Sequence, residues 1–178
     1  IKPSAQISLS GTSVETTGSI TATVTFTDNE SGLNITGSKW VYNTNAGAIG
    51  EDESSYTNSF TNNNNPQTIT LSTTTAGTYY LHVLTVDNAG NKAETISDAI
   101  TVIQLATSIS VTPTSLTLEE GETKKLTATV IPTTANDKSV IWSSNNTNVA
   151  SVSSSGLLTA KSAGNTTITV TTADGSKK

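Results

Sequence analysis

The sequence predicts an all-β protein built as two β-sandwiches in tandem. Its 178 residues can form two domains, since a sandwich of this kind needs roughly 100 residues. Only 33% of residues are hydrophobic and 13% are charged, and Thr, Ser and Asn fill the balance. Disorder usually pairs low hydrophobicity with high charge, so this mixture indicates sheets with one solvated face, on which Thr is favourable. Alternation of apolar and polar residues recurs along the chain, as strands require.

Residues 20–27 show the clearest alternation, with apolar residues at even positions and Thr at odd ones. One face of this strand is therefore expected in the core and the other in water. Residues 43–65 are polar and irregular, and we expect a long exposed loop with short edge strands there. Further strands are predicted at 39–42, 67–71, 76–87 and 96–102. About seven strands in all match a constant-type immunoglobulin sandwich.

A second set of strands begins directly after the first. It is expected at 109–118 (broken by Pro113), 126–130, 140–143, 149–152, 157–160 and 167–170. The sequence therefore predicts two tandem immunoglobulin-like β-sandwiches, residues 1–103 and residues 104–178. Residues 103–106 form a connector too short and too apolar for a floppy tether.

The two halves repeat one plan. Each has a Trp in its third strand, Trp40 and Trp142, and each has an Ala-Gly pair with an apolar residue four positions after the Gly. We predict that both Trp side chains are buried in the cores of separate domains. The alternative is that the aromatic residues form a platform for stacking sugars: Trp40, Tyr42, Tyr79, Tyr80 and Trp142.

The second half resembles the bacterial immunoglobulin-like domain of group 2. The matching segments are Gly121-Glu122, Leu126-Thr127-Ala128, Val140-Ile141-Trp142-Ser143-Ser144, Val149-Ala150-Ser151-Val152 and Thr167-Ile168-Thr169-Val170. The resemblance implies a module of intimin- and invasin-type adhesins, cell-wall proteins or phage tail proteins. It also implies a last strand after Asp174-Gly175, so we expect the natural protein to continue past Lys178 and this domain to lack that strand.

The first half resembles another immunoglobulin-like module of bacterial surface proteins. The resemblance rests on Ser31-Gly32-Leu33, on Gly77 to Val83 and on Asp87-Asn88-Ala89-Gly90-Asn91. Tyr79 stands where such sandwiches carry a tyrosine corner, whose hydroxyl bonds a nearby backbone group. Thr166 occupies the equivalent place in the second half.

Composition limits the compartment and the partners. Without Cys there is no disulfide, thiol nucleophile or Cys-based metal site, and without Met we interpret residue 1 as an internal or processed position. A net charge of −5 with no basic stripe argues against nucleic acid, and no segment is apolar enough for membrane insertion. We expect an extracellular protein, secreted or on a bacterial surface.

Carboxylates at two predicted loops are the candidates for a calcium site. Asp28, Glu30, Asp87 and Asn91 follow strands that end at the same end of a sandwich, and Ca²⁺ prefers such oxygen ligands. The alternative, which we favour, is that Asp-Asn-x-Gly-Asn forms a turn through local side-chain bonds. No cofactor is expected.

Two further side chains could bear chemistry. His82 is the only His, and its alternation with Tyr80 and Leu84 predicts a strand-surface position rather than a catalytic one. Lys39 is a candidate for a Lys–Asn isopeptide crosslink, although no fixed motif supports one.

These observations predict a non-catalytic spacer or adhesion module of a larger bacterial protein. Its candidate partners are a host surface protein, a glycan or other domains of the parent chain. The alternatives are an accessory carbohydrate-binding pair of a polysaccharide-degrading enzyme and a decoration of a phage tail protein.

Overall fold

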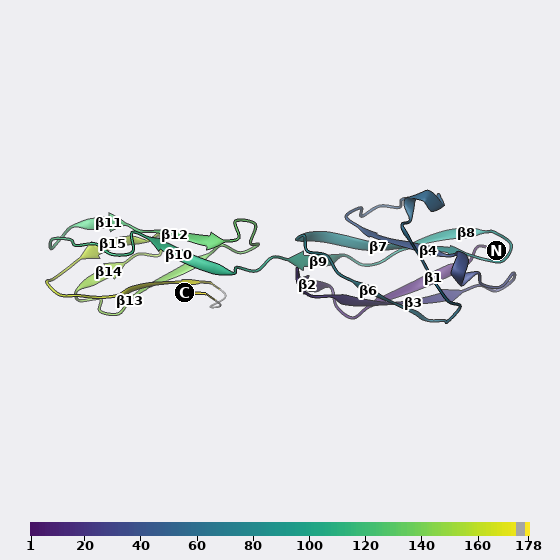
Figure 1. Cartoon of the computed structure of the whole chain (residues 1–178), viewed down its shortest axis with the longest axis horizontal. Coiled ribbons are helices and arrows are strands. Elements are labelled where there is room, and N and C mark those ends of the chain that lie inside the picture. Colours follow the sequence, from purple (N-terminus) through teal and green to yellow (C-terminus); the bar gives the residue numbers. More distant parts are fainter. Residues whose placement is uncertain (174–176) are drawn as a thin grey trace. The chain divides into compact units, whose positions relative to one another are not determined.

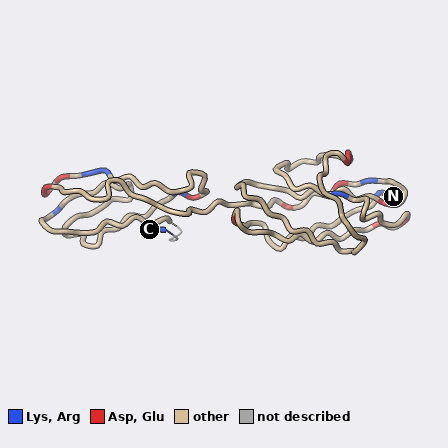
Figure 2. The backbone as a smooth tube through the Cα atoms, in the orientation of Figure 1, with Lys and Arg blue, Asp and Glu red and all other residues tan. Residues whose placement is uncertain are grey.

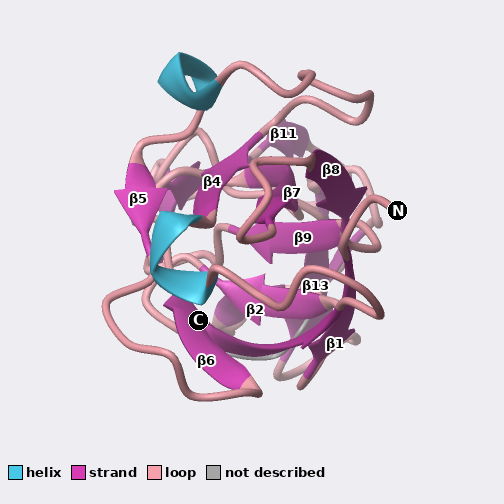
Figure 3. Ribbon diagram, turned by 90° about the vertical axis from the view of Figure 1, so that its right-hand side faces the viewer, coloured by secondary structure: helices cyan, strands magenta, loops and turns pink. Residues whose placement is uncertain are grey.

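The computed structural model describes residues 1–173 and 177–178 of the chain. The chain divides into two compact units, Ile1–Ile103 and Gln104–Lys178. Figure 1 shows the strands of each unit. Within the described residues, helix is limited to two short turns in the first unit, η1 (Ile35–Gly37) and η2 (Glu53–Ser55), drawn in cyan in Figure 3.

The first unit is a sandwich of two sheets. One sheet has the strand order β1-β3-β6, and the other has the order β2-β9-β7-β4-β5 with β8 paired to β7. The strands are β1 (Ser4–Leu9), β2 (Ser13–Glu15), β3 (Ile20–Thr27), β4 (Lys39–Asn43), β5 (Asn58–Ser59), β6 (Gln67–Leu71), β7 (Gly77–Val86), β8 (Lys92–Ile96) and β9 (Ile100–Ile103).

The alternation of β3 explains the core of this unit. Its apolar residues are buried, and they pack against apolar residues of β6, β7 and β9. This core contains Ile20, Ala22, Val24, Phe26, Ile69, Leu71, Leu81, Val83, Ile100 and Val102. Burial of these side chains supplies most of the driving force for folding, at about 25 cal/mol per Å² of apolar surface.

A second, smaller core lies on the other face of β7. Leu84 and Val86 pack there with Tyr56, and with Ile49 from the loop between β4 and β5. The loop therefore covers a sheet face, so the expectation that residues 43–65 form an exposed loop is only partly correct. The Asn-rich end of the segment is exposed.

The second unit contains seven strands in its described residues, arranged as small sheets. Their orders are β10-β12, β11-β15-β14 and β13-β16. The strands are β10 (Ser108–Thr112), β11 (Thr123–Lys125), β12 (Thr127–Ile131), β13 (Val140–Ser144), β14 (Ala150–Val152), β15 (Leu157–Ala160) and β16 (Ile168–Thr172). Leu126, Ala150 and Leu158 are the buried centre of this unit, and Trp142 packs against them.

These two units confirm the predicted fold class, an all-β chain of tandem immunoglobulin-like sandwiches. They also confirm the tyrosine corner, because the Tyr79 hydroxyl donates a hydrogen bond to the Thr75 carbonyl at 3.1 Å. In the second unit, Thr166 accepts a hydrogen bond from the Asn146 amide at 3.0 Å.

Three expectations need correction. The single closing strand at 96–102 is two strands, β8 and β9, separated by a break at residues 97–99. Trp40 and Trp142 pack against separate cores but remain partly exposed, so full burial was wrong. Residues 114–118 are not a strand, because no neighbouring strand pairs with them. The turn expected at Asp174-Gly175 lies outside the described residues.

Candidate functional site

The loops that carry the calcium candidates lie side by side at one end of the first unit. Leu33 forms an isolated bridge with Asp87, and the Asn88 amide donates to the Gly32 carbonyl at 2.9 Å. The structure therefore brings together residues 28–33, after β3, and residues 87–91, after β7, as the sandwich topology predicted.

Asp87 is buried at the centre of this contact and is used as a turn residue. Its Oδ1 accepts from the amides of Ala89 at 2.9 Å and Asn91 at 2.8 Å. Its Oδ2 accepts from the Asn91 side chain at 2.7 Å. Burial alone would raise the pKa of Asp87, but the bonds from Asn91, Ser31 and Ala89 lower it to about 2. The carboxylate is thus ionised and held by donors of its own turn.

Asp28 and Glu30 face other partners. Asp28 Oδ2 accepts from the Gly32 amide at 2.5 Å, while its Oδ1 is buried without a hydrogen-bond partner. Glu30 accepts from the Ile1 ammonium at 2.8 Å. Among the described residues, no three His, Asp or Glu side chains are placed to hold one metal ion. The arrangement is that of two interlocked turns.

A buried His–Glu pair lies beneath the loop between β4 and β5. His82 is fully buried, so its predicted strand-surface position is wrong. Its Nδ1 lies 2.8 Å from Glu94 Oε1, and its Nε2 lies 2.9 Å from the Asn45 carbonyl oxygen. Both ring nitrogens are therefore occupied, which leaves neither one to accept a proton from a Ser or Thr hydroxyl.

Glu94 extends this pair into a clamp on the loop. Its carboxylate accepts from the amides of Ile49 at 3.0 Å and Gly50 at 2.9 Å. Burial opposes ionisation, yet the Ile49 amide, the His82 ring and the Gly50 amide together hold the pKa of Glu94 below its ordinary value. Tyr56 closes the cluster by donating to the Gly50 carbonyl at 2.8 Å. We call these four residues, His82, Glu94, Gly50 and Tyr56, the loop clamp.

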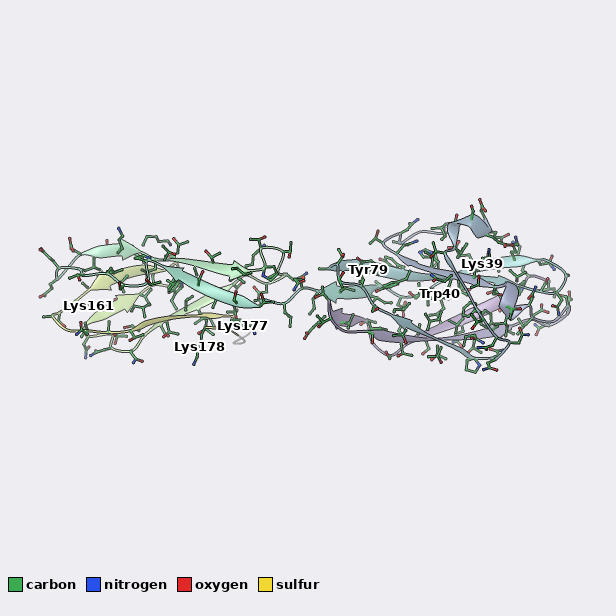
Figure 4. The ribbon with its side chains drawn as sticks, in the orientation of Figure 1. Lys39, Trp40, Tyr79, Lys161, Lys177 and Lys178 are labelled. Atoms are coloured by element: carbon green, nitrogen blue, oxygen red, sulfur yellow. The ribbon has the colours of Figure 1, made fainter. Side chains whose placement is uncertain are left out.

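The isopeptide candidate Lys39 is engaged in an ion pair instead. Its Nζ lies 3.2 Å from Glu53, which also bonds Lys92 at 2.6 Å. Figure 4 shows Lys39 on β4 next to Trp40. Solvent screens these exposed charges, so the pairs contribute little to stability.

The aromatic residues do not form one row. Tyr42 and Tyr79 stack with ring centroids 5.0 Å apart, while Trp40 packs on the core of the first unit and Trp142 on that of the second. Figure 4 labels Trp40 and Tyr79 on their separate strands. Tyr42 and Tyr79 are themselves partly buried against the core of the first unit.

Comparison with known proteins places the second unit in a family. Residues 105–178 match the model of the bacterial Ig-like domain (group 2). This part of the chain is a bacterial Ig-like domain of group 2. The match agrees with the strands that begin at β10 and with the core position of Trp142.

The curated relatives each share only a segment with this chain. The chain is 45% identical over 65 residues to a kappa-carrageenase of Pseudoalteromonas carrageenovora, covering 36% of this chain and 16% of that protein. It is 48% identical over 56 residues to an uncharacterized protein of Clostridium acetobutylicum, covering 32% of this chain and 14% of that protein. It is 49% identical over 63 residues to an alpha-L-arabinofuranosidase of Bifidobacterium longum subsp. longum, covering 35% of this chain and 6% of that protein.

Among solved structures, murine CEACAM1b is similar at a TM-score of 0.39 and 15% identity, over 96% of this chain and 93% of that one. Within the described residues of the chain, no helix is long and apolar enough to cross a membrane.

Proposed function

We propose that this chain is a non-catalytic structural and adhesion module of a larger bacterial protein that is secreted or displayed on the cell surface. The observation that carries the proposal is the group 2 Ig-like match over residues 105–178, since such domains occur in extracellular and surface proteins of bacteria. The chain also spans a small share of its curated relatives, 16% of the first and 14% of the second, as a module of a larger protein does.

The side chains of the first unit support a structural role. The ionised group of Asp87 accepts from backbone amides of its own turn, and that of Glu94, on β8, accepts from backbone amides of the loop between β4 and β5. His82 is likewise bonded at both nitrogens. Polar groups that saturate one another rigidify a fold and leave little capacity to bind or activate a substrate.

Antibodies raised against the purified chain test the proposal. Applied to intact bacteria that express the parent protein, they are expected to label the cells or the culture medium. Labelling that requires cell lysis would contradict it. A protein of the periplasm made in the same cells is the control for leakage.

A second candidate function, accessory carbohydrate binding, is favoured by two relatives that are named as polysaccharide-active enzymes, the kappa-carrageenase and the alpha-L-arabinofuranosidase. Titration of the chain with carrageenan and arabinan oligosaccharides distinguishes the two proposed functions. The structural proposal expects no saturable heat of binding. Saturable binding of either oligosaccharide would favour the second candidate.

A further inference from the structure

The loop between β4 and β5, residues 44–57, covers one apolar face of the first unit, and we call it the lid. Ile49 and Tyr56 of the lid pack on Leu84 and Val86 of β7. The loop clamp supplies the polar attachment of the lid to β7 and β8. The charge state of the clamp therefore decides how firmly the lid is held over this apolar face.

His82 presents both nitrogens of its ring to hydrogen-bond acceptors. The ring is fully buried, so water does not replace either partner. Its Nε2 lies 2.9 Å from the Asn45 carbonyl oxygen, which accepts hydrogen bonds and cannot donate them. Nε2 must therefore carry a proton. Its Nδ1 lies 2.8 Å from Glu94 Oε1, so the proton on Nδ1 depends on the state of that carboxyl group.

Glu94 acts as an acceptor on both of its oxygens. The Ile49 amide donates to Oε1 at 3.0 Å and to Oε2 at 3.1 Å, and the Gly50 amide donates to Oε2 at 2.9 Å. Burial opposes ionisation, but these bonds and the His82 ring hold the pKa of Glu94 below its ordinary value. An ionised carboxylate has no proton to share, so Nδ1 of His82 must carry one of its own. A ring with a proton on each nitrogen is an imidazolium.

The charged side chains of the lid and of the strands beside it are engaged in other pairs. Lys39 of β4 and Lys92 of β8 both pair with Glu53 of the lid. Lys2 pairs with Glu51 of the lid. Figure 2 marks the charged residues of the first unit in blue and red. The imidazolium and the Glu94 carboxylate are thus left to compensate each other beneath the lid.

Tyr56 of the lid also interacts with Glu94. Burial and the negative charge of Glu94 raise the pKa of Tyr56, so its phenol keeps its proton at neutral and mildly alkaline pH. It therefore continues to donate to the Gly50 carbonyl when the pH rises. Imidazole is the side chain whose charge ordinarily changes near neutral pH, which makes His82 the group of the clamp that responds there.

We propose that the lid is a pH-gated cover, which a buried imidazolium at His82 holds closed and which opens as pH rises and the ring releases a proton to solvent. The charged ring donates to both Asn45 and Glu94. After it loses a proton, one ring nitrogen faces an acceptor with a lone pair, and the Glu94 carboxylate stays buried without an opposite charge. The lid then loses its polar attachment, and Leu84 and Val86 become accessible.

Nitrogen NMR of the histidine ring in the whole chain tests the proposed charge state. His82 is the only His, so its ring signals are identified without ambiguity. Both ring nitrogens are expected to carry protons at about pH 7, and one of them should lose its proton as the pH is raised to about 8.5. A ring with one bare nitrogen at about pH 7 would overturn the proposal.

Amide exchange measures the opening of the lid in the same samples. The Gly50 amide donates to Glu94, and the Asn91 amide donates to Asp87, a buried carboxylate that does not pair with the His. The ratio of the two exchange rates removes the base catalysis common to all amides. Between about pH 6 and about pH 8.5, this ratio is expected to rise about tenfold or more as the lid opens. A constant ratio would overturn the proposal.

Two matched variants connect the opening to the ring. His82→Gln keeps an N–H donor for Glu94 but does not titrate, so its exchange ratio is expected to be independent of pH over this range. The same rise in this variant as in the unmodified chain would overturn the proposal. Glu94→Gln removes the carboxylate that stabilises the second proton, so its His82 ring is expected to be neutral at about pH 7. A ring that stays doubly protonated in this variant would show that the carboxylate does not hold the imidazolium, which would also overturn the proposal.

Discussion

Gly156 packs directly against the indole ring of Trp142 in the second unit. A Cβ atom at Gly156 would lie 3.1 Å from Trp142 Cε2 and Cζ2 and 2.8 Å from the Leu126 carbonyl oxygen. The backbone of Gly156 also has a φ of +82°, which disfavours any other residue. The turn between β14 and β15 can therefore approach the Trp only because residue 156 has no side chain.

Replacing this glycine is expected to destabilise the second unit. Gly156→Ala combines the left-handed backbone cost with overpacking against Trp142, about 2–4 kcal/mol in total, measured by urea unfolding. Gly121→Ala is the matched control, because Gly121 has a φ of +86° and nothing within 4 Å of its added Cβ. The control should cost about 1–2 kcal/mol. Equal losses would contradict the predicted collision with Trp142.

The loop clamp predicts a large effect from removal of His82. His82→Ala leaves the Glu94 carboxylate buried without its ring partner, so the free energy of unfolding should fall by about 3–5 kcal/mol. Lys92→Ala, also on β8, removes an exposed ion pair with Glu53 that solvent screens, and should cost far less. A loss below that of the control would show that the buried pair is not stabilising.

Glu94 also predicts a dependence of stability on pH. Its pKa is lowered in the folded state, so the stability it contributes is complete above its unfolded pKa of about 4.3 and is lost as pH falls through the folded value. Urea unfolding of the first unit from pH 7 to pH 3 should therefore show a steeper loss for the unmodified chain than for Glu94→Gln. Asp87, which shifts in the same direction, is present in both proteins and cancels in the difference. Parallel pH profiles would contradict the assignment.

Calcium is not expected to stabilise the first unit. Its candidate ligand Asp87 is already bonded by Ala89 and Asn91. The melting temperature of the chain should thus be the same in excess chelator and in millimolar calcium. A ligand that binds only the folded state raises this temperature. A rise of several degrees with calcium, absent in Asp28→Asn, would establish a calcium site at these loops.

The sequence predicted those parts of the fold that depend on local alternation. Residues 20–27 have a strict apolar–Thr pattern, and their burial follows it along the whole of β3. The tyrosine corner was predicted from the resemblance of the first half to immunoglobulin-like modules, and the hydroxyl bond of Tyr79 to Thr75 joins residues only four apart. Local patterns of this kind carry their own structural information.

The loop clamp could not be predicted because it depends on contacts between distant residues. His82 seemed to belong to a wet strand face, yet Ile49 and Tyr56 cover that face with a loop whose composition is polar. The one available signal was that both faces of β7 are apolar, with Leu81 and Val83 on one and Leu84 and Val86 on the other, which requires cover on each side. The strand predicted at residues 114–118 was wrong for the opposite reason. Leu116 and Leu118 have strand alternation, but a strand also needs a partner.

Stretching the whole chain by its two ends in a force microscope tests most directly that it is a pair of independently folded structural modules. Two separate unfolding events are expected, with contour-length gains of about 350 Å and about 250 Å, from units that end at Ile103 and Lys178. Gly156→Ala should lower the force of the shorter event and leave the longer one unchanged. A single event, or extension without a force peak, would show that the two units are not independently folded modules.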